Sequence, residues 1–408
     1  MKRVADHLSD VLSAVQPLAP IDVHLLEAHG CTLTEDVVAP WPLPRFDNSA
    51  MDGYAVHAAD VAGASEDDPV ELPVVADIGA GDSEASAIGP GLTARIMTGA
   101  PMPSGSDAVV PVEATDGGTA RVSISEAVSE GRHVRRAGED VREGDTVLVA
   151  GAYLGAAQLG LLAAVGFDHV TVRPRPRVVV ISTGSELVEP GLPLRPGQIT
   201  DSNSYMLTAA AWEAGALAYR AAPVTDDPAK VMDLIEDQLV RADLIVTSGG
   251  VSAGAYDVVK QVLSELGTVR FDKVAMQPGM PQGFGVIGES GTPIFTLPGN
   301  PVSAFVSFEV FVRPAIRKML GSSRLHLPTT KAVLQATLRS PEGKRQFARG
   351  RLLPTRDGAH QVTPLAGQGS HLLGDLAHAN ALVVVPEQVT EVAAGQVVET
   401  VLLERRKE

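Results

Sequence analysis

The sequence has few of the residues that mark secreted or membrane proteins. Its 408 residues include one cysteine, Cys31, so an intramolecular disulfide and a metal site built from several cysteines are excluded. We expect Cys31 to be a small buried hydrophobic residue. No apolar run reaches the roughly 20 residues that a membrane-spanning helix needs. The first ten residues contain acids and a histidine but no apolar signal core, so a cytoplasmic location is expected.

Positive charge is also scarce. The chain has 33 Lys and Arg against 49 Asp and Glu, which gives a formal net charge of −16. This balance argues against nucleic acid as a partner, because binding to phosphate backbones depends on a basic surface. An acidic chain that binds an anion must gather its basic residues locally. Residues 132–136 and 344–351 do so, although each is equally typical of a solvated charged face.

Several familiar catalytic signatures are missing. The sequence has no Walker A motif, no His-Glu-x-x-His motif and no Gly-x-Ser-x-Gly motif. Residues 283–288 match the dinucleotide pattern Gly-x-Gly-x-x-Gly literally. They follow Pro278 and Pro281 and do not form the turn between a strand and a helix, so we do not expect dinucleotide binding there.

The most informative segment runs from Asp243 to Lys260. Its first part is an apolar run rich in β-branched residues, which predicts a buried strand. Residues 248–250 (Ser-Gly-Gly) then allow a tight turn and close backbone approach, and helical spacing resumes at Tyr256. A strand, a glycine turn and a helix start together predict an anion cradle. Asp257, at the helix start, is either a first-turn acid that stabilises the helix or a metal ligand beside a bound phosphate.

Strand–helix alternation after Arg173 predicts a mostly parallel sheet. Two further strands end in polar turns, at residues 183–186 and 298–301, and ligands bind at the carboxyl ends of such strands. The carboxylates expected at this edge are Glu186, Asp226 or Asp227, and Asp257. Three carboxylates beside backbone N–H groups suit Mg²⁺ held between the protein and a phosphate-like ligand. The alternative is that they are helix caps and solvated loop acids.

The pattern of apolar and turn-forming residues changes along the sequence and predicts an α/β plus β protein of four parts. An amphipathic helix from residue 3 and a second short helix before residue 27 are expected, with a break at Pro17 and Pro20. Helices are also expected at 155–165 and from Asp201. The predicted parts are an N-terminal and linker domain (1–46 and 141–172), a small β insertion domain (47–140), an α/β domain (173–325) and a C-terminal β-barrel domain (326–408).

Six motifs identify a family to which the chain is similar. They are Phe46-Asp-Asn-Ser-Ala-Met-Asp-Gly-Tyr-Ala-Val56, Arg95-Ile-Met-Thr-Gly-Ala-Pro101, Arg135-Arg-Ala-Gly-Glu-Asp140, Ser182-Thr-Gly-Ser-Glu-Leu187, Thr247-Ser-Gly-Gly-Val-Ser252 and Leu297-Pro-Gly-Asn-Pro-Val-Ser303. Together, in this order and over nearly the whole chain, they resemble the molybdopterin molybdenumtransferases, which include MoeA and the E domain of gephyrin.

This resemblance implies a multidomain, elongated fold whose α/β domain is shared with other proteins of molybdenum cofactor biosynthesis. It implies that this α/β domain (173–325) binds molybdopterin and that the N-terminal and linker domain (1–46 and 141–172) mediates dimerisation. It implies a homodimer with an active site between subunits, formed by the α/β and C-terminal domains of one chain and the small β domain of the other. The implied reaction is Mg²⁺-dependent insertion of molybdate into adenylylated molybdopterin with release of AMP. The implied upstream donor is a molybdopterin adenylyltransferase.

The resemblance also implies roles for individual residues. Those implied to be catalytic are Asp52, Thr98 and Asp140 of the partner's small β domain, together with Glu186, Asp226 and Asp257. Glu186, Asp226 and Asp257 are also the implied metal ligands. The implied substrate-binding residues are Ser248, Gly249, Gly250, Gln277, Pro298, Pro301, Arg349 and Ser370.

One segment departs from the family pattern. Many members have two lysines in the part equivalent to residues 274–285, where this chain has Gln277 and Met280. Glutamine can donate hydrogen bonds, but methionine cannot. Basic residues elsewhere, namely Arg132, Arg135 and Arg349, could supply positive charge instead.

A second hypothesis is a gephyrin-like dimeric scaffold, either non-catalytic or moonlighting. Gephyrin's E domain captures a receptor peptide between its α/β and C-terminal domains, so a related chain could bind the peptide tail of a membrane, cytoskeletal or cell-division protein. The missing lysines favour this scaffold. The retained acids Glu186, Asp226, Asp257 and Asp140 favour the enzyme, because a scaffold has no need of clustered carboxylates.

Overall fold

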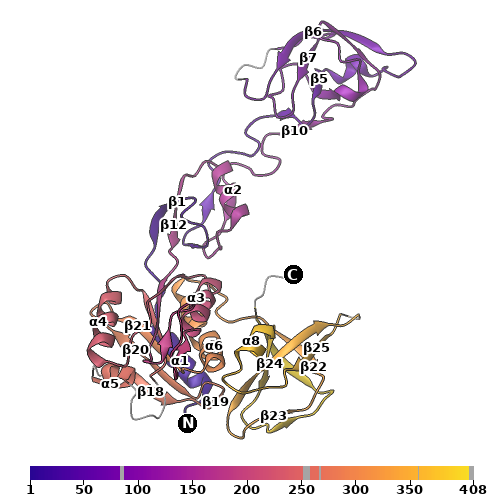
Figure 1. Cartoon of the computed structure of the whole chain (residues 1–408). Coiled ribbons are helices and arrows are strands. Elements are labelled where there is room, and N and C mark those ends of the chain that lie inside the picture. Colours follow the sequence, from indigo (N-terminus) through magenta and orange to yellow (C-terminus); the bar gives the residue numbers. More distant parts are fainter. Residues whose placement is uncertain (83–86, 251–257, 266–267, 357, 404–408) are drawn as a thin grey trace. The chain divides into compact units, whose positions relative to one another are not determined.

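The computed structural model describes residues 1–82, 87–250, 258–265, 268–356 and 358–403 (Figure 1). Contacts group the chain into two compact units. The larger unit comprises Met1–Asp22, Gly30–Thr34 and Thr171–Glu408, and the smaller unit comprises Val23–His29 and Glu35–Val170. The division into four parts with the boundaries given above stays a prediction.

A six-stranded sheet forms the centre of the larger unit, in the order β16-β13-β17-β21-β20-β18. Its strands are β13 (Arg177–Ser182), β16 (Leu217–Arg220), β17 (Leu244–Ser248), β18 (Arg270–Lys273), β20 (Pro281–Ile287) and β21 (Thr292–Leu297). The first four strands in that order run parallel, whereas β20 and β18 are antiparallel to their neighbours. The predicted mostly parallel sheet is therefore confirmed. Residues 283–287 lie inside β20, so this glycine pattern is not a nucleotide-binding turn.

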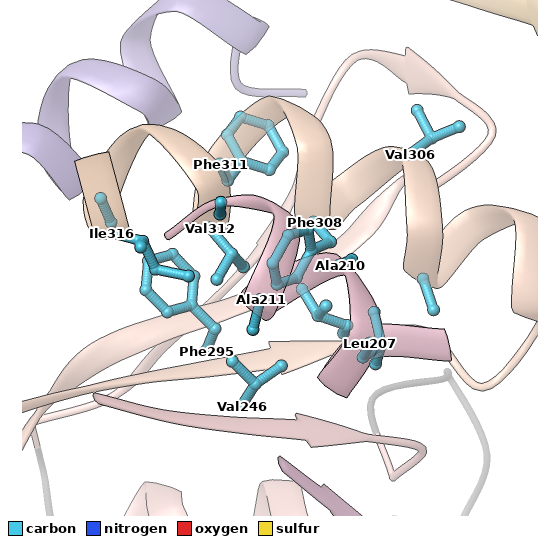
Figure 2. Packing of buried hydrophobic residues seen from close by; sticks show 14 of the residues in the cluster. Leu207, Ala210, Ala211, Val246, Phe295, Val306, Phe308, Phe311, Val312 and Ile316 are labelled. Atoms are coloured by element: carbon cyan, nitrogen blue, oxygen red, sulfur yellow. The ribbon is translucent and has the colours of Figure 1, made fainter. Parts of the chain in front are cut away.

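Helices and the sheet enclose two apolar clusters in this unit. The helices are α1 (Val4–Ala14), α3 (Asn203–Glu213), α4 (Pro228–Leu239), α5 (Val258–Glu265), and α6 (Pro301–Ser307), which continues through a π-helical turn (Phe308–Val312) into α7 (Arg313–Met319). Figure 2 shows Ala210 and Ala211 of α3 packed beside Phe308, with Val246 of β17 and Phe295 of β21 in the same cluster. The small alanine side chains let α3 approach the continuous helix formed by α6, the π-helical turn and α7 closely. Each large buried apolar side chain contributes roughly 1.5–3 kcal/mol, so this core fixes the starts of α3 and α6 at the sheet edge.

A closed five-stranded barrel follows in the C-terminal region, as predicted. Its strands are β22 (Thr329–Leu334), β24 (Arg345–Pro354), β25 (His360–Pro364), β26 (Ala381–Val385) and β28 (Val397–Leu402). Strand β24 pairs with both β25 and β26, which closes the ring. Strand β19 (Met276–Gln277) pairs with the start of β24 and links the barrel to the α/β part. Helix α8 (Leu373–His378) follows the loop after β25.

The smaller unit contains a five-stranded sheet in the order β8-β5-β7-β6-β9. Its strands are β5 (Gly53–Val56), β6 (Val70–Ile78), β7 (Thr93–Ile96), β8 (Ala108–Pro111) and β9 (Arg121–Ile124). Tyr54 is fully buried in its core and donates a hydrogen bond from its hydroxyl to Gly118 O (2.9 Å). The predicted helix at 155–165 is present as α2 (Ala156–Ala164).

Short strands complete the architecture, four sets of them in pairs and one as a three-stranded sheet in the order β1-β12-β2. The three-stranded sheet contains β1 (Ile21–His24), β12 (His169–Arg173) and β2 (Thr32–Leu33). The pairs are β3 (Val37–Val38) with β11 (Thr146–Leu148), β4 (Asn48–Ser49) with β10 (Val134–Arg135), β14 (Leu187–Val188) with β15 (Ile199–Thr200), and β23 (Leu338–Arg339) with β27 (Glu391–Val392). The prediction of a second helix before residue 27 is wrong, because residues Ile21–His24 form strand β1. Apolar and polar residues alternate there, which fits a strand better than a helix.

Cys31 is buried, as expected, and burial raises the pKa of its thiol. Within the part of the chain that the structure describes, no helix combines the length and apolar character required to cross a membrane.

Candidate active site

An open pocket of about 760 Å³ lies at the carboxyl ends of β13, β17 and β21. The turns that follow these strands line it, at Thr183–Gly184, Ser248–Gly250 and Pro298–Pro301. His371 and Leu373, from the loop that precedes α8 and from its start, line another side. We call this space the strand-end pocket. It lies where the sequence predicts ligand binding, because the carboxyl ends of parallel strands meet at one edge of a sheet.

The glycine turn after β17 is held tightly between its neighbours. Gly249 and Gly250 have φ angles of +98° and +70°, a region that suits glycine far better than other residues. A Cβ atom on Gly249 would lie 2.6 Å from Thr183 O. The N–H of Gly249 donates to Leu297 O (3.1 Å), and the N–H of Thr183 donates to Ser248 O (3.0 Å). The turn therefore needs glycine for its conformation and also for its close approach to the adjacent strand end.

Two of the predicted carboxylates, Glu186 and Asp226, line the strand-end pocket with exposed side chains. Asp226 accepts a hydrogen bond from the N–H of Ser185 (2.9 Å) and donates its own N–H to the Ser185 hydroxyl (3.1 Å). Asp227 instead caps α4 by accepting from the N–H of Ala229 (3.0 Å). The structure thus separates the alternatives that the sequence left open, since Asp226 faces the pocket and Asp227 is the helix cap.

Two residues that the sequence reasoning treated only as a helix start, Asp201 and Asn203, also line the pocket. The carboxylate of Asp201 is 1% exposed and accepts from the Ser182 hydroxyl (2.9 Å) and from the N–H of Ser204 (3.1 Å). Asn203 Nδ2 donates to Ser248 Oγ (2.8 Å) and to Gly299 O (2.6 Å). Their polar segment therefore touches the ends of β13 and β17 and the turn after β21. The sequence does contain a signal for this second role. A helix start needs one capping residue, whereas this segment has both Asp201 and Asn203.

Arg349 does not line the strand-end pocket but supports a loop beside it. Its side chain is buried, and its guanidinium donates to Gly369 O (3.1 Å) and to Gly367 O. Burial lowers the pKa of this guanidinium below its usual value. The same loop carries Ser370, whose hydroxyl accepts from Asn300 Nδ2 (3.0 Å). In the structure, Arg349 therefore stabilises the conformation of this loop through hydrogen bonds to its carbonyl groups. Direct contact of Arg349 or Ser370 with substrate stays a prediction.

Replacing Arg349 with methionine is expected to loosen this loop without unfolding the protein. Loss of the guanidinium leaves two loop carbonyls without their donor but also removes a costly buried charge, so global unfolding free energy should change by about 1 kcal/mol or less. Hydrogen exchange of amides in residues 367–370 should accelerate about tenfold. Arg351→Met, an exposed change on the same strand, should alter neither quantity. Unchanged hydrogen-exchange rates in Arg349→Met would show that the loop keeps its conformation without the guanidinium.

Gln277 and Met280 occupy the segment that leads to the pocket. Gln277 pairs in register with Gln346 of the barrel, and Met280 O accepts from the N–H of Val274 (2.7 Å). Of this segment, Pro281 reaches the described lining. Among the described lining residues none is Lys or Arg, and His371 is the one side chain that can become positive. The lining also carries acids, so an anionic ligand bound here needs a cation or neutral hydrogen-bond donors.

In the smaller unit the structure brings together Asp52 and Thr98 but not Asp140. Asp52 Oδ1 accepts from the N–H (2.7 Å) and the hydroxyl (2.8 Å) of Thr98. These hydrogen bonds hold the pKa of Asp52 below its usual range. Asp140 is exposed, and its N–H donates to Leu43 O (3.1 Å).

The predicted metal ligands are Glu186, Asp226 and Asp257. In the ranges that the structure describes, no group of three or more His, Cys, Asp or Glu residues lies close enough to hold a metal ion. Asp257, the third predicted ligand, lies outside the described residues. Two exposed carboxylates, Glu186 and Asp226, beside a glycine turn form an oxygen donor set that fits Mg²⁺. The three-carboxylate metal site stays a prediction.

Three family models match successive parts of the chain. They are the MoeA N-terminal region (domain I and II) over residues 2–166, a probable molybdopterin binding domain over 179–318, and the MoeA C-terminal region (domain IV) over 331–403. The chain belongs to the MoeA family. The family expected from the six motifs is therefore confirmed.

Named members of the MoeA family resemble the chain over nearly its full length. Molybdopterin molybdenumtransferase 2 of Mycobacterium tuberculosis is 52% identical over 404 residues, which cover 97% of this chain and 98% of the relative. Molybdopterin molybdenumtransferase 1 of that organism is 42% identical and covers 99% of both chains. The Bacillus subtilis molybdopterin molybdenumtransferase is 35% identical, over 91% of this chain and 87% of its own.

Solved MoeA structures support the fold. A crystal structure of a molybdopterin biosynthesis MoeA protein from Pyrococcus horikoshii has a TM-score of 0.77 and 33% identity, and covers 99% of both chains. A second has a TM-score of 0.74 and 28% identity, with coverage of 98% and 100%. The predicted fold class is confirmed, and so is the assignment to a transferase of molybdenum cofactor biosynthesis.

Proposed function

We propose that this MoeA-family protein inserts molybdate into adenylylated molybdopterin in a Mg²⁺-dependent reaction that releases AMP. The observation that carries the proposal is the strand-end pocket itself, where a glycine turn and two exposed carboxylates, Glu186 and Asp226, meet at one sheet edge. Such a site suits a phosphate group that is bound together with a hard divalent cation. The names and high identity of the mycobacterial relatives support the same reaction class.

Each part of the pocket has a role in this reaction. The turn at Ser248–Gly250 lets the phosphate approach the backbone closely, and Glu186 and Asp226 would hold Mg²⁺. When bound, Mg²⁺ neutralises charge on the phosphate oxygens, which favours departure of AMP. Asn300 and the loop that carries Ser370 contact each other across one side of the pocket, so they orient the substrate between the α/β part and the barrel.

The assembly is part of the proposal. In a homodimer, the small β domain of a second copy would supply Asp52, Thr98 and Asp140 to complete the site. The substrate would come from a molybdopterin adenylyltransferase. We place the reaction in the cytoplasm.

One observation favours the scaffold as a second candidate function. The described lining of the pocket lacks Lys and Arg, and a scaffold that binds the peptide tail of a cell-division or membrane protein has no need of those charges. A well-folded protein that binds neither AMP nor molybdate would favour this candidate over the enzyme.

Introducing the two lysines that many family members have at positions 277 and 280 is expected to strengthen molybdate binding. Gln277→Lys combined with Met280→Lys adds two positive charges near a dianion and should lower the Kd for molybdate about tenfold, which corresponds to about 1.4 kcal/mol. Isothermal titration with molybdate measures the change. The control is Leu353→Lys with Gln361→Lys, which adds the same charge at two exposed, paired barrel positions outside the pocket. An equal Kd in both double variants would show that other groups already neutralise the anion.

The experiment that tests the proposed function follows molybdenum into the product. Purified protein is incubated with adenylylated molybdopterin, Mg²⁺ and molybdate, and the pterin fraction is analysed for molybdenum. We expect about one molybdenum per pterin and an equal amount of AMP. A pterin fraction without molybdenum, from correctly folded protein, would contradict the proposed function.

A further inference from the structure

The side-chain amide of Asn203 has a single orientation in the strand-end pocket. Its Nδ2 lies 2.6 Å from Gly299 O, and a carbonyl oxygen can only accept. The atom at this position must therefore be the nitrogen, which also lies 2.8 Å from Ser248 Oγ. Asn203 thus cross-links the turn after β17 to the turn after β21 and donates to the hydroxyl of Ser248.

This donation determines what Ser248 can do. Because Nδ2 has no lone pair to offer, Ser248 Oγ must accept from it, and the hydroxyl proton must point elsewhere. The other contact of Ser248 Oγ in the described residues is Pro298 O at 3.4 Å, too long for a strong hydrogen bond. Ser248 lines the pocket. Ser248 is 2% exposed, and within the described residues its proton is directed only at this long contact, so it can turn toward an acceptor that enters the pocket.

We propose that Asn203 is a positioning residue that makes Ser248 a hydrogen-bond donor to an oxyanion in the strand-end pocket, either a phosphate oxygen of the adenylylated substrate or a molybdate oxygen. The proposal rests on the proposed function and deepens it. A hydroxyl that accepts from an amide becomes a better donor, because hydrogen bonds in a chain polarise one another. A donor of this kind matters in a pocket whose described lining has no Lys or Arg.

The start of α3 does not depend on Asn203. The carboxylate of Asp201 accepts from the N–H of Ser204 and from the hydroxyl of Ser182, so this end of the helix has its own anchor. Asn203 is the first residue of α3, where a negative side chain is favourable because of the helix dipole. Asn203→Asp should therefore leave the helix start intact. It replaces the donor to Gly299 O with an acceptor and reverses the hydrogen bond to Ser248, so we expect the melting temperature to fall by about 2–4 °C.

In Asn203→Asp the carboxylate accepts the Ser248 proton, so that proton is no longer available to the ligand. We expect the KM for adenylylated molybdopterin to rise between about tenfold and 100-fold, the usual range for losing a hydrogen bond to a charged group. Ser248→Ala should show a similar loss, and Asn203→Asp with Ser248→Ala should be no worse than the worse single variant. Asn203→Ala, which leaves the hydroxyl free to rotate, should lose only a few-fold.

Ser202→Asp is the matched control for the added charge. Ser202 lines the same pocket at the N-cap of α3, and its side chain makes no capping hydrogen bond. It should weaken binding less than threefold, so a larger loss in Asn203→Asp reports the reversed hydrogen bond. Titrations with AMP and with molybdate distinguish the two ligand sources, because only the source that contacts Ser248 should lose affinity in Asn203→Asp.

The outcomes separate the inference from the proposed function. A loss in Asn203→Asp that exceeds the loss in Ser202→Asp and is not additive with Ser248→Ala would support the inference. Equal losses in Asn203→Asp and Ser202→Asp, or additive losses with Ser248→Ala, in an active wild-type enzyme would overturn the inference alone. If the wild-type protein binds neither AMP nor molybdate and does not release AMP, both the inference and the proposed function are overturned.

Discussion

Asp226→Asn is expected to lower kcat/KM for AMP release at least about 100-fold, which corresponds to about 2.7 kcal/mol of transition-state stabilisation. The asparagine oxygen can still accept from the N–H of Ser185, so the local turn remains supported. What is lost is one negative charge that faces the pocket beside Glu186. Because that charge is proposed to hold Mg²⁺, the Mg²⁺ concentration for half-maximal activity should rise as well.

Asp227→Asn provides a control that differs by one position. Asp227 caps α4 through the N–H of Ala229, and asparagine is also a good N-cap residue, so stability should change by only a few tenths of a kcal/mol. Activity and Mg²⁺ dependence should match those of the wild type. If Asp226→Asn and Asp227→Asn had the same activity and the same Mg²⁺ midpoint, the assignment of Asp226 to the metal would be wrong.

Gly249→Ala is expected to destabilise the protein and to disrupt the pocket. The φ angle of +98° costs a residue with a Cβ about 1–2 kcal/mol. The new Cβ would also lie 2.6 Å from Thr183 O, and the backbone shift needed to relieve that contact costs about another 1–3 kcal/mol. We therefore expect a total loss of about 2–5 kcal/mol in unfolding free energy, measured by denaturant titration. Binding of AMP should fall more than tenfold, because the displaced strand end carries Ser248.

The matched control for this change lies across the same pocket. Gly299 does not have a positive φ, and its Cβ would meet Gly249 Cα at an ordinary 3.7 Å. Gly299→Ala should therefore cost less than about 1 kcal/mol. Similar unfolding free energies for the two alanine variants would contradict the account of the tight turn.

The edge of the sheet that carries the site could be predicted from local sequence. The apolar run before Ser248, the glycines after it and the strand–helix rhythm after Arg173 are all properties of neighbouring residues. The topology then follows from general rules for parallel sheets, which bring the ends of β13, β17 and β21 together. Short segments were harder to predict. Ile21–His24 is a strand rather than the expected helix, and its alternation of apolar and polar residues extends over only four residues, too few to outweigh the expectation of a helix.

The side-chain contacts of the site could not be predicted in this way. Asn203 reaches Gly299, which lies 96 positions later in the chain, and nothing in the local pattern specifies such a contact. The choice between Asp226 and Asp227 depends on which carboxylate the start of α4 uses as its cap. The burial of Arg349 depends on the path of a barrel loop. Asp257 lies outside the described residues, and its role as a metal ligand stays a prediction.

The most direct test of the central claim is AMP release from adenylylated molybdopterin by the purified protein, measured with both Mg²⁺ and molybdate, with each alone and with neither. The account predicts efficient release only when both are present, and loss of that release in Asp226→Asn but not in Asp227→Asn. No release under any condition, from a well-folded protein, would contradict the claim that this pocket is the active site of a molybdenumtransferase.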